Sequence, residues 1–321
     1  MNSRTAVLAE AGNAIPRSAR KRMRRATRHR LLIGLMFVFP WVIGLLVFNL
    51  YPILASAYYG FTEYSILRAP EWTGLENYRV MFTEDKLYFK SLSNTLYFVL
   101  LSVPLSTAIP VVLAIILNAK VKGMAFYRTV FYLPSIMPAI ASSMLWLWIL
   151  NPQYGLANEI LRWIGLAPVG WMTSPQWSKP SLAAMSLWGA GGGIVIFLAG
   201  LQDIPVHLYE AAELDGANGL QRLFRVTLPL LTPSIFFNMV IDLIYYFQYF
   251  TQAYIMTGGT GGPLDSTLFY GMLLFRNAFE YFNMGYASAM AWILFLIVFI
   301  ITFLLYNSSG RWVHYQGAEQ V

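Results

Sequence analysis

The amino-acid sequence predicts an all-α integral membrane protein with six transmembrane helices. Of its 321 residues, 57% are hydrophobic and 12% are charged, and the mean hydropathy is +0.54. That composition is too apolar for a soluble globular domain. Crossing a bilayer as a helix takes about 20 apolar residues, and six stretches are long enough. They lie near 31–50, 95–117, 130–150, 181–201, 230–255 and 285–306.

Prolines and glycines interrupt several of these stretches. They are Pro104, Pro110, Pro134, Pro138 and the triplet Gly191-Gly192-Gly193. Such residues are tolerated in a span because neighbouring helices and local adjustments satisfy the freed backbone groups. We expect the glycine triplet to allow a close helix approach or a bend, with a gating role as the alternative.

The orientation follows from the basic residues. The first 30 residues carry nine Lys and Arg, so the positive-inside rule places this arm in the cytoplasm. Basic residues of the arm are therefore read as a topology signal, with no nucleic-acid partner. Six spans return the tail 311–321 to the cytoplasm and put the polar loop 203–227 on the same side. The six-span membrane domain is then 31–310, and the connections 61–94, 151–180 and 257–284 face outward.

Two of these segments have predictable local structure. The start of 61–94, at Gly74–Tyr78, is typical of a short amphipathic helix over the ends of the spans. The run 258–262 is a cluster of turn-forming glycines. The chain has no cysteine, which excludes disulfides and thiolate metal sites.

The polar loop 203–227 cannot lie in hydrocarbon. Asp203 is a candidate N-cap and Pro205 suits the first turn of a helix. Residues 206–215 favour helix, and Gly216 can end it in a left-handed conformation. A second short helix, 218–226, leads into the fifth span. Ala211, Ala212 and Ala217 keep the surface shallow, so another protein can approach closely.

The fifth span contains a carboxylate, Asp242, at its middle. Helical spacing predicts one stripe of Asn238, Asp242, Tyr245 and Tyr249. Ionisable groups within a membrane are costly, so they usually face a cavity or a partner. Aromatic faces beside amide and carboxylate groups suit a sugar, and we expect this stripe to contact substrate. The alternative is that the stripe joins helices of two subunits and that its tyrosines anchor the bilayer interface.

The run from Glu210 to Ala217, with Pro229 and Pro233 after it, resembles the EAA motif of bacterial ABC-importer permeases. Further motifs resemble the carbohydrate branch of that family, in the same order along 31–310. They are Gly74–Tyr78, Phe131–Pro134, Asn151-Pro152, Phe247-Gln248, Tyr254–Thr257 and Gly285–Ala289. The chain is similar to the first permease subunit of maltose-type and glycerol-phosphate-type importers.

This resemblance implies an ABC type I importer permease fold with a cytoplasmic coupling helix. The residues that would face the ATPase are Glu210, Ala211, Ala212, Asp215, Gly216 and Ala217. Glu210 would pair with the ATPase, and Gly216 would set the bend. Coupling through 206–226 would drive alternating access for a carbohydrate, and within that class an oligosaccharide.

The implied partners are a second homologous permease subunit, a homodimeric ATPase pair and an extracytoplasmic solute-binding protein. Membrane lipid and the carbohydrate complete the set, and the location implied is a bacterial inner membrane with both termini cytoplasmic. This chain has no Walker A motif, because the glycines at 258–262 lack the Lys-Ser/Thr ending. ATP and Mg²⁺ would therefore be bound by the separate ATPase, with no cofactor in this chain.

Two other classes stay open. A secondary transporter or channel for a polar solute would need charge relays or paired broken helices, and Asp242 is the single convincing buried charge. A membrane enzyme would need a catalytic motif, which is missing. The histidines His29, His207 and His314 have no metal-ligand spacing, so we expect no metal. The choice between a neutral and an acidic sugar stays open.

Overall fold

The computed structural model describes residues 32–119 and 121–314. The predicted arm 1–30, with His29, and residues 315–321 of the predicted tail lie outside this part of the chain. The chain divides into two compact units, Met1–Tyr58 and Tyr59–Val321, which are described separately.

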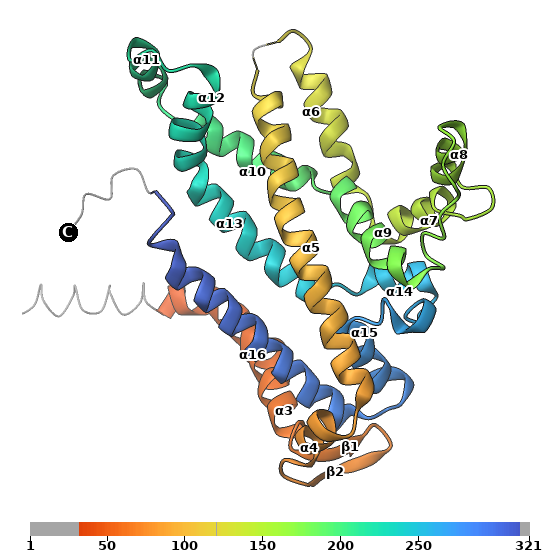
Figure 1. Cartoon of the computed structure of the whole chain (residues 1–321). Coiled ribbons are helices and arrows are strands. Elements are labelled where there is room, and N and C mark those ends of the chain that lie inside the picture. The colour runs from red at the N-terminus through yellow and green to blue at the C-terminus, as the bar shows by residue number, and fades with distance from the viewer. Residues whose placement is uncertain (1–31, 120, 315–321) are drawn as a thin grey trace, which may run out of the picture. The chain divides into compact units, whose positions relative to one another are not determined.

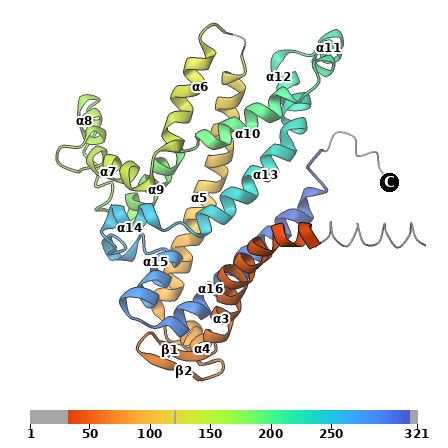
Figure 2. The same cartoon turned by 180° about the vertical axis from the view of Figure 1, so that it is seen from behind.

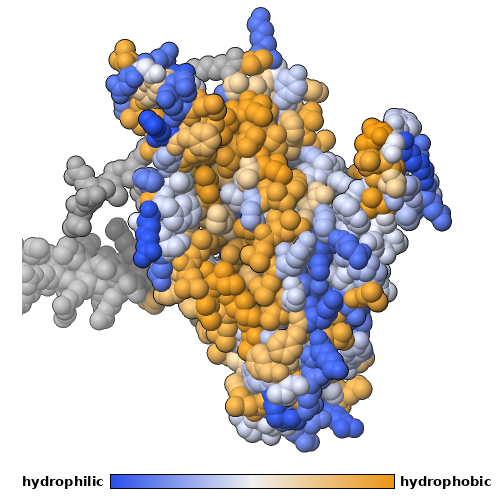
Figure 3. All heavy atoms as spheres, viewed as in Figure 1, coloured by the Kyte–Doolittle hydropathy of each residue, from blue (hydrophilic) through white to orange (hydrophobic). Residues whose placement is uncertain are grey.

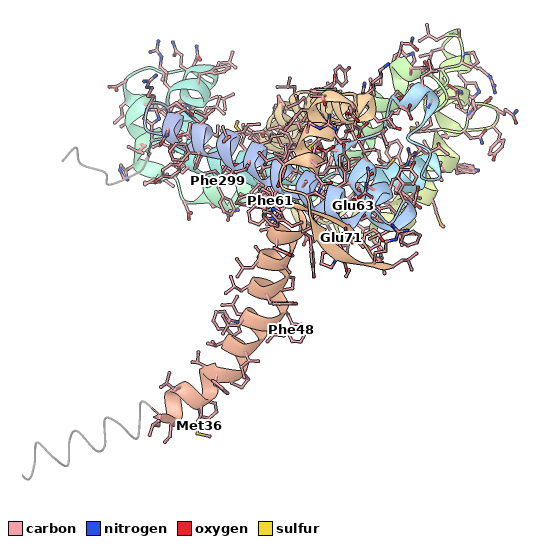
Figure 4. The ribbon with its side chains drawn as sticks, turned by 90° about the horizontal axis from the view of Figure 1, so that it is seen from below. Met36, Phe48, Phe61, Glu63, Glu71 and Phe299 are labelled. Carbon is pink, nitrogen blue, oxygen red and sulfur yellow. The ribbon has the colours of Figure 1, made fainter. Side chains whose placement is uncertain are left out.

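The first unit contains one long helix, Leu32–Tyr59, of 28 residues and mean hydropathy 2.2. It includes a π-helical turn, η1 (Leu46–Leu50), and ends with α3 (Tyr51–Tyr59). Its apolar side chains are exposed all round, as Met36 and Phe48 illustrate in Figure 4. At 1.5 Å per residue the helix is about 42 Å long, which exceeds the hydrocarbon core of about 30 Å. The predicted first span is confirmed and extends nine residues further than expected.

The second unit holds the remaining candidate spans. Three are long single helices: α5 (Lys86–Leu117), the helix Gly219–Phe247, and α16 (Met284–Ser309). Two more are bent pairs, α6 (Met124–Tyr132) and η2 (Leu133–Ile136) with α7 (Ala139–Ile149), and α9 (Pro175–Trp188) with α10 (Gly191–Gln202). Together with the helix Leu32–Tyr59 of the first unit, the described residues contain four candidate spans, or six if each bent pair counts as one span.

The third predicted span, 130–150, is not one straight helix. It bends by 100° between η2 and α7, where Met137 is extended (ψ 136°) just before Pro138. Proline disfavours helical backbone at the residue before it, which explains the break. The fourth span bends by 51° at Gly189-Ala190. There Gly191 lies so close to α6 that a Cβ would be 2.8 Å from the Phe131 carbonyl oxygen, so the close approach expected of the glycine triplet is present at this position.

The fifth predicted span, 230–255, was wrong at both ends. Its helix begins at Gly219, as α12 (Gly219–Arg222), η3 (Leu223–Thr227) and α13 (Leu228–Phe247), and stops at Phe247. A separate short helix follows, α14 (Thr251–Thr257). Apolar and aromatic residues continue through the break, so composition gave no sign of it.

The connections contain more structure than expected. The predicted connection 61–94 is too long, because α5 already begins at Lys86, nine residues before the predicted second span. The part before α5 forms a two-stranded antiparallel hairpin, β1 (Thr62–Ser65) and β2 (Arg68–Trp72), and then the expected short helix, α4 (Glu76–Thr83). The strands were not predicted. The other connections carry α8 (Leu156–Trp163), η4 (Pro263–Asp265), α15 (Tyr270–Phe275) and η5 (Arg276–Glu280). α11 (Val206–Leu214) lies in the polar loop.

In the second unit, α5 is the central helix and packs against α9, α10, α13 and α15. α11 and α12 lie at one end of this unit, and the hairpin with α4 lies at the other (Figures 1 and 2). One apolar cluster surrounds Phe98 near the hairpin end, and a second surrounds Phe197 and Leu231 near the polar loop. The unit therefore presents two polar ends separated by an apolar body.

The start of α16 tests this packing. A Cβ on Gly285 would overlap the Thr62 carbonyl oxygen, so Gly285→Ala should destabilise the fold by about 1–3 kcal/mol through overpacking. We expect a lower melting temperature of the purified, detergent-solubilised protein.

Gly44→Ala is the matched control, because nothing lies within 4 Å of a Cβ at that helical glycine. Replacing a helical Gly by Ala is otherwise stabilising by about 0.5–1 kcal/mol. Equal melting temperatures for the two variants would contradict the close approach of α16 to β1.

Candidate functional site

A cavity of about 390 Å³ lies where α5, α9, α10 and α13 meet η2 and α7. All four residues of the predicted stripe line it: Asn238, Asp242, Tyr245 and Tyr249. Further polar side chains line it as well, namely Ser106, Ser135, Ser142, Ser186, Tyr246 and Gln252. Among the described residues that line it, there is no Lys, Arg, His or Glu, so Asp242 is the one Asp, Glu, Lys, Arg or His side chain in this lining. A chamber rich in hydroxyl and amide groups fits a polar, uncharged or partly charged small molecule.

Asp242 is held through one of its two oxygens. Ser106 Oγ and Asn238 Nδ2 both donate to Oδ2, at 2.7 and 2.8 Å. Asn238 is one turn before Asp242 on α13, whereas Ser106 belongs to α5. The carboxylate therefore joins two helices of this chain, whereas the alternative reading expected contact between helices of two subunits. Neither bond uses Oδ1, which leaves an acceptor for a ligand in the same side chain.

The tyrosines of the cavity differ in their hydrogen bonding. Tyr246 OH donates to Ser186 Oγ at 3.2 Å, and Tyr245 OH accepts from Gln252 Nε2 at 2.9 Å. Tyr249 is 2% exposed, and its hydroxyl has no hydrogen-bond partner among the residues described. A buried polar group without a partner costs about 1–3 kcal/mol. A ligand hydroxyl that reached Tyr249 would remove that cost.

The predicted stripe needs one correction. Tyr249 lies two residues beyond the end of α13 at Phe247, so it does not continue the helical face of Asn238 and Asp242. It reaches the cavity because the chain turns there, and Phe98 packs against its ring with centroids 4.6 Å apart. Ser106, Ser186 and Tyr246 were not predicted as lining residues. Tyr246 was within reach of sequence reasoning, because it follows Tyr245 directly, whereas the serines carry no local signal.

The glycine triplet also shapes this cavity. Gly192 and Gly193 line it. A Cβ on Gly193 would be 3.3 Å from Asn238 Oδ1, while nothing lies within 4 Å of one on Gly192. Gly191 therefore allows close packing against α6, whereas Gly192 borders open space in the cavity.

The polar loop forms the helix–turn–helix that was expected, with one change. α11 spans Val206–Leu214, and Gly216 has φ +78°, the left-handed conformation predicted for it. Asp203 was expected as an N-cap, but it follows the last residue of α10, and Pro205 precedes α11 instead. The second helix begins with a capping box between Asn218 and Gln221.

The six predicted coupling residues lie together on this loop. Ala212, Asp215, Gly216 and Ala217 line a shallow pocket of about 280 Å³, together with Arg222 and Arg225. Glu210 and Ala211 are exposed on α11. Glu213 pairs with Arg222 at 3.0 Å, whereas Glu210 forms no ion pair within the described ranges. Its carboxylate is therefore available to another protein.

The loop and the cavity share one helix. α12, η3 and α13 run continuously from Gly219 to Phe247, so Gly219 and Asp242 are about 35 Å apart on the same element. A hydrogen bond between Tyr209 OH and Thr227 Oγ1, 3.1 Å apart, joins α11 to the early part of this helix. One continuous helix therefore connects the loop with the cavity wall.

The chain was compared with known proteins. Residues 106–314 match the family "Binding-protein-dependent transport system inner membrane component". The chain is 45% identical to the probable ABC transporter permease protein YesP of Bacillus subtilis, with 92% of this chain and 96% of that protein covered. It is 31% identical to the lactose transport system permease protein LacF of Rhizobium radiobacter, over 86% and 93% of the two chains.

A third relative is the sulfoquinovosyl glycerol transport system permease protein SmoG of Agrobacterium fabrum, with 31% identity over 84% of this chain and 88% of that protein. Among solved structures, the chain resembles a bacterial ABC transporter that imports the acidic polysaccharide alginate. The TM-score is 0.75 at 24% identity, and 90% of this chain and 99% of the other are covered. At that identity the likeness concerns the fold.

The unpaired hydroxyl of Tyr249 predicts an unusual mutational result. Tyr249→Phe removes a buried group with no partner, so the ligand-free protein should be as stable as wild type or more stable. Tyr246→Phe, the control, loses the bond to Ser186 and should be destabilised by about 1 kcal/mol.

Thermal unfolding of both purified variants without ligand measures the difference. A loss of stability in Tyr249→Phe equal to that in Tyr246→Phe would mean that the Tyr249 hydroxyl is paired in the protein.

Proposed function

Because the chain belongs to the family of binding-protein-dependent transport system inner membrane components, we propose that it is one permease half of an ATP-driven importer that moves a carbohydrate by alternating access. Its type I importer permease fold, predicted from the sequence, is confirmed by the match to the alginate importer. The family consists of transport components, so this chain is a permease and not an enzyme. The names of relatives that carry lactose, sulfoquinovosyl glycerol and arabinooligosaccharides support a sugar as the cargo.

The observation that carries this proposal is the single helix from Gly219 to Phe247. Its first turns belong to the loop that would receive the ATPase, and its last turns carry Asp242, Tyr245 and Tyr246, which line the cavity. When two ATPases close on ATP and Mg²⁺, they would move α11 and the base of this helix together. The cavity wall then changes position without any deformation travelling through loops.

The chemistry of the cavity suits a sugar. Asp242 Oδ1 can accept from sugar hydroxyls, Tyr249 OH can donate to one, and the tyrosine rings offer faces for C–H groups. Since the cavity is open, a homologous second subunit would supply its other wall. An oligosaccharide would then be bound between two halves, each contributing part of the contacts.

The remaining partners follow from the two ends of the second unit. The end with α11 and α12 would face the cytoplasm, in a bacterial inner membrane with both termini on that side. The opposite end, with the hairpin and α4, would receive an extracytoplasmic solute-binding protein. Glu63 and Glu71 face each other across that hairpin (Figure 4), and like charges directly opposite are unfavourable. A basic surface on the binding protein would offset their repulsion.

The ATPase contact can be tested by co-purification. Gly216→Pro cannot adopt φ +78°, because proline fixes φ near −65°, and Glu210→Lys reverses the free charge on α11. We expect each variant to lose most of the ATPase that co-purifies with the wild-type chain.

The control is Glu71→Lys, which reverses an exposed charge at the other end of the second unit and should retain the ATPase. Full transport by a chain that never binds an ATPase would end the importer proposal in favour of a secondary transporter or channel.

The cavity can be tested by substrate uptake. Asp242→Asn keeps the size of the side chain but removes its charge, and hydrogen bonds to charged groups contribute about 1.5–3 kcal/mol. We expect uptake at low substrate concentration to fall about ten-fold or more, while the ATPase still assembles.

Asp265→Asn, outside the cavity, is the control and should leave uptake unchanged. Unaltered uptake by a correctly assembled Asp242→Asn transporter would show that Asp242 has a purely structural role.

A further inference from the structure

Three lysines gather on one face of the second unit, near its hairpin end. Lys86 and Lys90 are exposed on the first turns of α5, and Lys179 lies at the start of α9. Figure 3 shows a hydrophilic band on this face, over the lower part of α5, bordered by hydrophobic surface. These three residues, the lysine stripe, are separate from the cavity and from the polar loop 203–227, which is called the coupling loop below.

Lys179 is held in place by neutral groups. Its Nζ donates to Asn94 Oδ1 at 3.0 Å and lies 4.8 Å from the centre of the Tyr97 ring. Asn94 is itself fixed, because its Nδ2 donates to the backbone carbonyls of Asp265 and Leu268 at 2.7 and 3.0 Å. The orientation of the Asn94 amide is therefore determined, and its oxygen is directed at the ammonium. The result is a built, half-buried cation position.

The lysine stripe has no counter-charge in the described part of the chain. Lys90 is close enough to Lys179 to repel it, and neither forms an ion pair there. The neighbouring carboxylates are already used. Glu76 and Glu84 pair with Arg79, while Asp85 caps α5 and accepts a hydrogen bond from Tyr286. Two ammonium groups that repel each other are stabilised by an anion placed between them.

The stripe faces away from the cavity. At 3.6 residues per turn, Lys86, Lys90 and Tyr97 lie about half a turn around α5 from Ser106, which lines the cavity. The same side of α5 continues with Leu100, Pro104 and Ala108, all exposed and uncharged. Cationic groups therefore end an apolar row on the side of α5 where lipid tails would lie.

The depth in the bilayer also fits a lipid headgroup. α5 has 32 residues, about 48 Å at 1.5 Å per residue, against a hydrocarbon core of about 30 Å. The stretch of α5 that the sequence predicts to cross the hydrocarbon begins at residue 95. Lys90 and the Lys179–Asn94 contact therefore lie at the boundary between hydrocarbon and headgroups, where lipid phosphates are found.

We propose that Lys90 and Lys179 bind the phosphate of an anionic phospholipid, with an acyl chain lying along Leu100, Pro104 and Ala108. The lipid belongs to the leaflet on the side opposite the coupling loop. Its headgroup supplies the negative charge that the protein lacks there, and it holds the outer turns of α5 and α9 together. This site does not depend on which sugar is carried.

The test uses the complete complex, delipidated in detergent and titrated with phosphatidylglycerol or phosphatidylcholine while bound lipid is counted by native mass spectrometry. The wild type should bind phosphatidylglycerol at least ten-fold more tightly than phosphatidylcholine. The double variant Lys90→Gln/Lys179→Gln should lose this preference. Lys90→Arg/Lys179→Arg should retain it, because the charges remain.

The matched control removes two exposed cations elsewhere, Arg68→Gln/Lys122→Gln, and should bind lipid within two-fold of the wild type. Four results would overturn the proposal. They are equal binding of both lipids by the wild type, unchanged binding by the double Gln variant, displacement of the lipid by inorganic phosphate or an alginate oligosaccharide at millimolar concentration, and loss of the second permease subunit from the double Gln variant. The last would make the stripe a subunit contact.

Discussion

The unbroken helix from Gly219 to Phe247 is the constraint on which the rest of the second unit depends. In hydrocarbon every backbone amide must be paired within the chain, so a helix cannot yield at its middle without a cost of several kcal/mol. Pro229 and Pro233 are accommodated near its start, where a π-helical turn, η3, precedes α13. The second helix of the polar loop and Asp242 are consequently parts of one continuous helix. α5 and α10 are the surfaces against which this helix must move.

α5 separates two environments. Ser106 faces the polar cavity and bonds to Asp242, whereas the side with Lys90 and Tyr97 is exposed and apolar further along. One helix can have both roles because the side chains on its two sides contact different surroundings. The bond between Ser106 and Asp242 also joins α5 to the moving helix. Any displacement of α13 that lengthens this bond leaves the carboxylate to be satisfied by something else, and a sugar hydroxyl in the cavity is available for that purpose.

The sequence predicted those parts of the fold whose cause is local. Gly216 was expected in a left-handed conformation because a helix had to end there, and six apolar stretches follow from bilayer thickness. The bend of 100° between η2 and α7 could not be obtained the same way, since Pro134 and Pro138 permit either a kinked span or a broken one. The structure breaks the span at Met137, which is extended before Pro138. The hairpin strands were missed because Thr62–Ser65 and Arg68–Trp72 are short and polar, and their pairing involves Asn77 and the start of α16.

The candidate site shows the same division. Asn238 and Asp242 were found because an intramembrane acid one turn after an amide is a local signal. Tyr249 was predicted to reach the cavity as part of the helical stripe. The helix instead ends before it, and the turn at Gln248 brings its ring against Phe98. Because that turn buries the hydroxyl without a partner among the described residues, the cavity lining contains both an unpaired hydroxyl and a carboxylate with a free oxygen. Two such groups in one wall favour a ligand that both donates and accepts hydrogen bonds, which neighbouring sugar hydroxyls do and a simple ion does not.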